Sequence, residues 1–130
     1  MKKTILPILA TMFAAAMLML AGCASAPPVD PRLTLGPGVA SQLTVEPLAT
    51  RALARDVTEV RLTVQNRDSS KPRVFEYKVE WRDVQGFPIS TVTGDWTRFA
   101  APAGAQQTLS IVGPSPDAVK FNIYIRKAAN

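Results

Sequence analysis

The sequence predicts an all-β protein, an immunoglobulin-like antiparallel β-sandwich of about seven strands. Three observations indicate this fold class. Apolar side chains recur at every second position, polar turns separate the apolar runs, and the chain of 130 residues has room for one small domain. A strand with one apolar and one polar face is typical of antiparallel sheets that enclose a shared core. Short strands at this spacing favour a sandwich.

The first 22 residues have the pattern of an export signal. Lys2 and Lys3 form a positive start, and residues 5–20 form an apolar stretch that is short for a membrane-spanning helix. The following Leu20-Ala21-Gly22-Cys23 looks like the lipobox of bacterial lipoproteins, which implies cleavage before Cys23 and lipidation of its sulfur. The expected signal peptide is therefore 1–22, and Cys23 is the expected membrane anchor.

A lipidated Cys and a proline-rich tether are expected over residues 23–38, and the β-sandwich domain over residues 39–130. Three prolines favour extended polyproline II, so residues 24–31 reach roughly 25 Å. Ala24 follows the lipidated Cys, and in enterobacterial-type lipoproteins an Asp there favours retention in the inner membrane. The resemblance therefore implies the periplasmic face of the outer membrane as the location.

Strands are expected where apolar and polar residues alternate. A short run over residues 43–46 ends at Pro47, which suits an edge strand. Longer runs cover residues 59–65 and 75–82, and two more follow toward the C-terminus, over 108–111 and 119–126. Residues 48–56 are ambiguous, because their Leu, Ala and Arg residues could also form a short helix.

Polar segments rich in turn-forming residues separate these strands. Residues 66–72 form a polar loop between the two clearest strands, and residues 83–86 indicate a tight turn with Gly86 at positive φ. The segments 102–104 and 113–117 indicate two further turns.

Composition excludes several kinds of chemistry. The chain contains no His and one Cys, so Ser–His and Cys–His catalysis, His- or Cys-ligated zinc and an intramolecular disulfide are all excluded. The formal net charge of +5 includes Lys2 and Lys3 of the signal segment, and nucleic acid is not an expected partner. No enzymatic activity, cofactor or metal is expected.

Two tryptophans have different expected roles. Trp81 lies on the apolar face of its strand and is expected in the core, where it would join the two sheets. Trp96 follows Gly94-Asp95 outside a regular alternation, so it either covers an end of the sandwich or is exposed as a contact for a partner. Because Trp and Arg are enriched at binding hot spots, Trp96 and Arg98 are candidate binding residues. The loop residues Pro114, Ser115 and Pro116 are further candidates.

Charged residues on the strands have a structural interpretation. Glu76, Lys78, Glu80 and Arg82 alternate in sign on one face of one strand, which predicts a solvated face that protects a sheet edge. A carboxylate pair of Glu76 and Glu80 is the alternative. A second group of residues is basic but interrupted by acidic residues. A patch that binds anionic envelope polymers is the less favoured interpretation of this group, which consists of Arg51, Arg55, Arg61, Arg67, Lys71 and Arg73.

The chain resembles the YcfL family of small, uncharacterised proteobacterial outer-membrane lipoproteins over most of its mature domain. The lipobox and Trp96 match this family, as do three sequence motifs: Tyr77-x-Val79-x-Trp81-x-Asp83-x-x-Gly86, Pro102-x-Gly104, and Pro114-Ser115-Pro116-x-Ala118 leading into Phe121-x-x-Tyr124-x-Arg126. The resemblance implies no catalytic residues. In some enterobacteria the gene lies beside that of a lipoprotein that activates a penicillin-binding protein, which hints at cell-wall biogenesis.

The sequence therefore predicts a lipoprotein anchored in the outer membrane and facing the periplasm. Its sandwich would act as a non-enzymatic binding or accessory module in the cell envelope, with another envelope protein as its partner. The alternative is a protein that binds an envelope glycan or lipid, such as peptidoglycan or lipopolysaccharide. In that case Trp96 would be a stacking surface and the basic loops would bind anionic groups.

Overall fold

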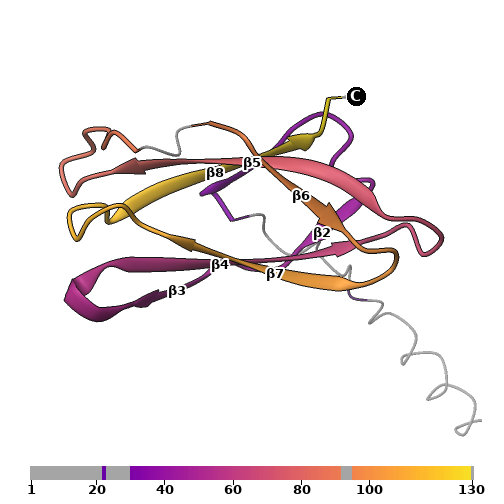
Figure 1. The fold of residues 1–130 in the computed structure, drawn as a ribbon, viewed down its shortest axis with the longest axis horizontal. Helices are drawn as coiled ribbons and strands as arrows, with labels where there is room; N and C mark the ends of the chain where they lie inside the picture. Colours follow the sequence, from indigo (N-terminus) through magenta and orange to yellow (C-terminus); the bar gives the residue numbers. More distant parts are fainter. Residues whose placement is uncertain (1–21, 23–29, 92–94, 130) are drawn as a thin grey trace, which may run out of the picture.

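The computed structural model describes residues 22, 30–91 and 95–129 of the chain. These residues form eight β-strands and one short 3-10 helix, and the strands make two sheets. In Figure 1 the sheet with β5 and β8 lies above the sheet with β4 and β7. The predicted all-β sandwich is confirmed. Residues 1–21 of the expected signal peptide, and residues 23–29 with Cys23, lie outside the described residues.

The first sheet contains β1 (Leu33–Leu35), β5 (Arg73–Arg82), β6 (Thr97–Ala101) and β8 (Lys120–Lys127). Its strand order is β1-β8-β5-β6, so β5 and β8 are the inner strands. β5 pairs antiparallel with both β6 and β8, whereas β1 pairs parallel with β8. The sequence predicted an antiparallel sandwich, and the parallel pairing of β1 with β8 is the exception to that prediction.

The second sheet is built around β4 (Thr58–Asn66). β7 (Gln106–Val112) pairs with almost the whole length of β4 on one side. On the other side β2 (Leu43–Val45) and β3 (Ala49–Ala52) pair with successive halves of β4. The turn around Gly104, which has a φ of 60°, carries the chain from β6 in the first sheet to β7 in the second.

The core lies between the two sheets and follows the predicted alternation. Trp81 is 4% exposed and its ring lies 5.5 Å from that of Phe121, which confirms its predicted place in the core. Each fully buried Val, Leu, Ile or Phe side chain contributes about 1.5–3 kcal/mol to stability. The largest contributions to the core come from β4, β5 and β8, through Val60, Leu62, Val64, Phe75, Val79, Trp81, Phe121, Ile123 and Ile125.

The folded domain begins earlier than the expected boundary at residue 39. Leu33–Leu35, expected to be part of the tether, forms β1 and pairs with Ile123–Ile125 of β8. Both leucines are partly buried against the core, and the Gly36 amide donates a hydrogen bond to the Ile125 carbonyl oxygen at 2.7 Å. This strand has only three residues, Leu-Thr-Leu, which is too short for an alternation of apolar and polar residues to be recognised. The sequence pattern therefore did not predict it.

Two further differences concern the ends of elements. The ambiguous residues 48–56 form β3 and the 3-10 helix η1 (Ala54–Asp56), where Arg55 and Asp56 have positive φ angles. β3 forms because its backbone pairs with β4. Val119, expected to begin the last strand on its apolar face, instead precedes β8 and is 46% exposed.

The predicted positive φ of Gly86 is confirmed at 92°. Within the described part of the chain, no helix is long and apolar enough to cross a membrane.

Candidate binding surface on the first sheet

Glu76 lies at the centre of a three-strand contact on the outer face of the first sheet. It stands opposite Arg98 of β6 on one side and Arg126 of β8 on the other. The Nε atom of Arg126 donates a hydrogen bond to Glu76 Oε2 at 2.8 Å, and Nε of Arg98 lies 3.3 Å from Oε1. Glu76 is only 8% exposed. The hydrogen bond from Arg126, and next that from Arg98, lower the pKa of Glu76 below its ordinary value although burial opposes this shift.

Trp96 completes this contact from the segment that precedes β6. The guanidinium carbon of Arg126 lies 3.9 Å from the centroid of the Trp96 ring, which is a cation–π arrangement. Trp96 is half-buried, so it is neither a core residue nor a fully exposed one. The four residues Glu76, Trp96, Arg98 and Arg126 are called the arginine–tryptophan cluster below.

The expected edge-protecting role of the charges on β5 is wrong. β5 is an inner strand, with β6 and β8 on either side, so its charged face protects no edge. The charges contact one another or neighbouring strands instead: Lys78 lies 3.5 Å from Glu80, whose other oxygen is 3.2 Å from the Tyr124 hydroxyl. Glu76 and Glu80 are thus held by different groups, and no cation of the described residues contacts both of them.

The loop with the other three candidate residues lies elsewhere. Pro114 and Pro116 are exposed and Ser115 is half-buried. The hollow beside this loop, of about 450 Å³, is also lined by Asp83 to Gln85 of the β5 turn. Because Arg82 pairs with Lys120 while Glu76 pairs with Arg126, this loop and the cluster lie about 20 Å apart along the strands. The structure therefore does not bring the two sets of predicted binding residues together.

The basic residues of the expected patch divide between the two sheets. Arg51 donates a hydrogen bond to Glu59 on the second sheet, and Arg61 lies 3.9 Å from the same carboxylate. The hydrogen bond from Ser110, and next that from Arg51, lower the pKa of Glu59. Lys71 and Arg73 instead lie near the arginine–tryptophan cluster. They line a hollow of about 590 Å³ together with Arg98 and Lys127, and the four residues are called the basic hollow below.

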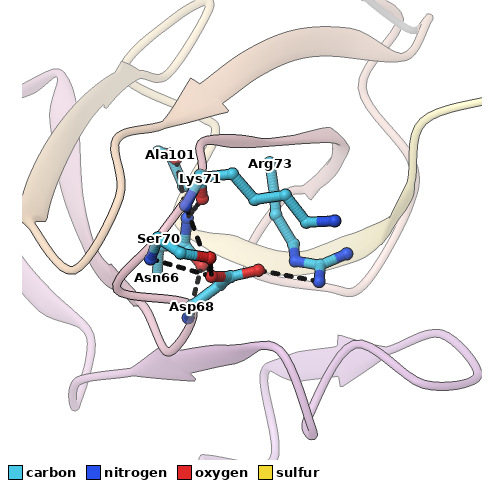
Figure 2. A network of polar contacts seen from close by, with 6 residues as sticks. All are labelled: Asn66, Asp68, Ser70, Lys71, Arg73 and Ala101. Carbon is cyan, nitrogen blue, oxygen red and sulfur yellow. Dashed lines mark hydrogen bonds and ion pairs between the residues drawn. The ribbon is translucent and has the colours of Figure 1, made fainter.

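The loop between β4 and β5 holds Lys71 and Arg73 in place. Figure 2 shows the Asp68 carboxylate at its centre, contacted by Ser70, Lys71 and Arg73. The Arg73 Nη2 atom lies 2.9 Å from Asp68 Oδ2. The hydrogen bonds from the Ser70 hydroxyl and the Ser70 amide, with a smaller contribution from Arg73, hold the pKa of Asp68 far below its usual range. The loop is therefore a fixed platform at neutral pH.

Asn66 joins this loop to the turn that leaves β6. Its side-chain amide donates to the Lys71 carbonyl oxygen and to the Ala101 carbonyl oxygen, both at 3.0 Å, and its own oxygen accepts from the Asp68 amide at 2.9 Å (Figure 2). Asn66 is 1% exposed. A buried amide with this many partners fixes the backbone on both sides of it, because leaving any of them unpaired is costly.

Sequence reasoning identified Trp96 and Arg98 but missed Arg126, Lys127 and the central place of Glu76. Outward-facing charges on a strand have the same pattern whether they are solvated or paired. Their roles depend on which strands are neighbours, and a strand order such as β8-β5-β6 cannot be obtained from periodicity. The contact of Glu76 with Arg98 and Arg126 can be recognised only once the registers of the three strands are known.

The chain matches the family described as "Protein of unknown function (DUF1425)" over residues 33–127, from the first residue of β1 to the last of β8. No curated protein matches it. The crystal structure of Campylobacter jejuni cj0090 is similar, with a TM-score of 0.65 and 22% identity over 76% of this chain and 100% of that chain. A DUF1425 family member from Shewanella sp. pv-4 has a TM-score of 0.59 and 23% identity over 68% of this chain and 80% of that chain. At these identities the likeness shows the fold alone, but the family match covers most of the chain. The chain belongs to the DUF1425 family.

Proposed function

We propose that the protein is a lipoprotein anchored through Cys23 in the outer membrane, and that its sandwich is a non-enzymatic module that binds another protein of the cell envelope. The lipobox supports the anchor, and the resemblance to the YcfL lipoproteins is compatible with membership of DUF1425. The same resemblance supports a role in cell-wall biogenesis. The observation that carries the binding function is the arginine–tryptophan cluster.

The cluster has two properties of a protein-binding hot spot. Trp and Arg are enriched in such sites, and the side chain of Arg98 is 61% exposed. In addition, Glu76 and Trp96 already hold both guanidinium groups in one geometry, so a partner would immobilise few additional rotamers on binding. Guanidinium groups donate in several directions, so the surface suits an acidic partner.

Photo-crosslinking in living cells tests the binding function without disturbing the cluster. Ala100 is exposed and faces outward on β6, two residues from Arg98, so a photoreactive residue there leaves the cluster intact. Ala49 on β3 is an exposed Ala of the other sheet and is the matched control. We expect a discrete protein adduct from position 100 that is absent from position 49.

The double variant Trp96→Ala/Arg126→Ala then links the adduct to the cluster. The proposal predicts that these substitutions abolish the adduct from position 100 even after correction for the amount of folded protein, which the loss of Arg126 beside Glu76 lowers. An adduct that survives both substitutions, or identical products from positions 100 and 49, would contradict a binding function of this surface.

The anchor is tested separately by the substitution Cys23→Ser. We expect the variant to lose incorporation of labelled fatty acid and to move from the outer-membrane fraction to the soluble periplasm, because one sulfur carries the acyl chains that hold the protein. If the wild-type chain incorporates no labelled fatty acid, the anchor is contradicted. The binding function is then still tested by the crosslinking experiment.

A second candidate function is binding of an envelope glycan or lipid, such as peptidoglycan or lipopolysaccharide. One observation favours it, the basic hollow beside Arg98. It shares a single residue with the arginine–tryptophan cluster, so the two functions can be separated by substitution.

A further inference from the structure

The basic hollow gathers four cationic side chains from separate parts of the chain. Lys71 comes from the loop before β5, Arg73 from the start of β5, Arg98 from β6 and Lys127 from the end of β8. Its lining is completed by Gln42, Pro72, Val74, Ala128 and Ala129, and its volume is about 590 Å³. No carboxylate side chain is among these lining residues.

Two of these four charges have no ion-pair partner among the residues that the structure describes. Arg73 is paired with Asp68 at 2.9 Å and Arg98 with Glu76 at 3.3 Å. Among residues 30–91 and 95–129, no Asp or Glu side chain lies within ion-pair distance of Lys71 or Lys127. Lys71, Arg98 and Lys127 are exposed, so water and salt weaken their mutual repulsion, and an anion in the hollow would be attracted by all of them.

Both unbalanced lysines project from fixed backbone. Lys71 lies in the loop held by Asn66 and Asp68 (Figure 2). Lys127 is the last residue of β8, and its Nζ atom would lie 2.8 Å from a Cβ added at Gly38. Gly38 has a φ of 73°, a conformation that favours glycine, and the end of the Lys127 side chain lies beside it. The ammonium of Lys127 therefore packs against the turn before β2.

We infer that the basic hollow binds a phosphate group. A phosphate monoester carries close to two negative charges at neutral pH and three oxygens that point in different directions. Two ammonium groups with rotatable donors, next to two guanidinium groups that retain free N–H groups, can donate to all three of these oxygens, whereas a carboxylate offers two oxygens and one charge. The inference deepens the second candidate function. Its test leaves Trp96 and Arg126 untouched, so its failure is distinguishable from failure of the protein-binding proposal.

Titration of the full-length protein with inorganic phosphate tests the site, with backbone amide NMR shifts as the readout. We expect saturable shifts at Lys71, Arg73 and Lys127. The double variant Lys71→Ala/Lys127→Ala should bind phosphate at least about tenfold more weakly, because it removes both unbalanced charges. The control Lys78→Ala/Lys120→Ala removes the same charge from the outer face of the same sheet and should bind as wild type does. Equal weakening in both variants, or shifts that do not saturate, would overturn the inference.

Thermal unfolding gives an independent readout that does not depend on the spectra of a variant. Without phosphate, Lys71→Ala/Lys127→Ala should unfold at the same temperature as wild type or higher, because the repulsion is removed. Phosphate should raise the midpoint of wild type and of the control variant but not that of Lys71→Ala/Lys127→Ala. A midpoint that rises equally in all three proteins shows an adventitious salt effect and contradicts the site.

Two sources of the phosphate group are distinguished by the probe. Glucose 1-phosphate presents a soluble monoester, and vesicles of phosphatidylcholine with phosphatidic acid present the same group on a lipid surface. Loss of vesicle binding in Lys71→Ala/Lys127→Ala, with no response of wild type to glucose 1-phosphate, assigns the site to lipid phosphate. A response to both probes assigns it to the phosphate group alone, and a response to neither overturns the inference.

Discussion

Glu76 is a carboxylate that the fold keeps ionised although it is almost fully buried. Arg98 and Arg126 on the neighbouring strands balance its negative charge. The Trp96 ring packs against the guanidinium group of Arg126. Glu76 is 8% exposed whereas the side chains of Arg98 and Arg126 are 61% and 46% exposed, so losing these pairs costs more than losing a fully solvated pair and less than losing a fully buried one. Glu76 therefore adds to the stability that the apolar core gives the first sheet.

The substitution Glu76→Gln should lower the thermal midpoint by several degrees at pH 7. The pKa of Glu76 is lowered from 4.5 in the folded state, so its stabilisation is fully present above about pH 4.5 and is lost as the pH falls through the folded pKa. We therefore expect the difference between wild type and Glu76→Gln to shrink below about pH 4.5. Thermal unfolding followed by circular dichroism between pH 7 and pH 3 measures this dependence.

Glu80→Gln is the matched control, because Glu80 lies on the same face of β5 and its side chain is 37% exposed. It should change the midpoint little at any pH, since solvated ion pairs contribute little. Equal effects of the two substitutions at pH 7 would show that Glu76 is not the organising carboxylate of this sheet.

At the level of single residues, the sequence was informative where burial alone decides the role. Trp81 was predicted in the core because the alternation places it on the apolar face of its strand, and burial follows from that face. Glu76 occupies the opposite face of the same strand, and its pattern is that of a solvated charge. Its burial is caused by Arg98 and Arg126, which come from strands at large sequence separation, so no local signal records it.

The strands differ in how much of their pairing the sequence determines. The long strands β4, β5 and β8 alternate over many residues, so both their existence and their inward faces could be predicted. The short strands β1 and β3 contain few residues, and their extended backbone is fixed by hydrogen bonds to β8 and β4. Short strands are determined by their neighbours, which a periodic pattern cannot represent.

The pairing of β7 with β4 leads to a test that involves two adjacent residues. The Gly113 amide donates to the Thr58 carbonyl oxygen and the Asn66 amide donates to the Ala105 carbonyl oxygen. Because hydrogen-bonded pairs alternate in an antiparallel ladder, Leu109 directs its amide toward β4 while Thr108 directs its amide away. β4 is the only strand that pairs with β7 in the part of the chain that the structure describes.

Proline at these two positions should therefore have very different effects. Thr108→Pro removes an amide that donates to no other strand, so we expect a loss of less than about 1 kcal/mol. Leu109→Pro removes a ladder hydrogen bond and a partly buried side chain, and should cost about 2–4 kcal/mol. Urea unfolding of both variants measures the difference, and similar losses would contradict the register of β7 on β4.

At the scale of the whole molecule, β1 determines where the domain begins. If the chain is anchored as proposed, β1 also limits how far the domain lies from the membrane. β1 covers one edge of β8, and the Arg32 guanidinium lies 5.0 Å from the centroid of the Phe121 ring. If Cys23 carries the proposed anchor, only residues 24–29 remain between it and the described domain. Such a segment reaches about 19 Å when extended, which places the first sheet closer to the bilayer than a tether as far as residue 38 would.

A shortened chain that begins at residue 39 should consequently be much less stable than one that begins at residue 30. The shorter chain lacks the hydrogen bond from the Ile123 amide to the Arg32 carbonyl oxygen, at 2.8 Å, and the partly buried Leu33 and Leu35. Together these losses should lower the free energy of unfolding by about 3–5 kcal/mol. Urea unfolding compares the two chains, and hydrogen exchange at the Ile123 amide locates the change. Equal urea midpoints would contradict β1 as part of the domain. A lower midpoint for the shorter chain, with faster hydrogen exchange confined to the edge of β8, would show that the folded domain starts within the segment that the sequence assigned to the tether.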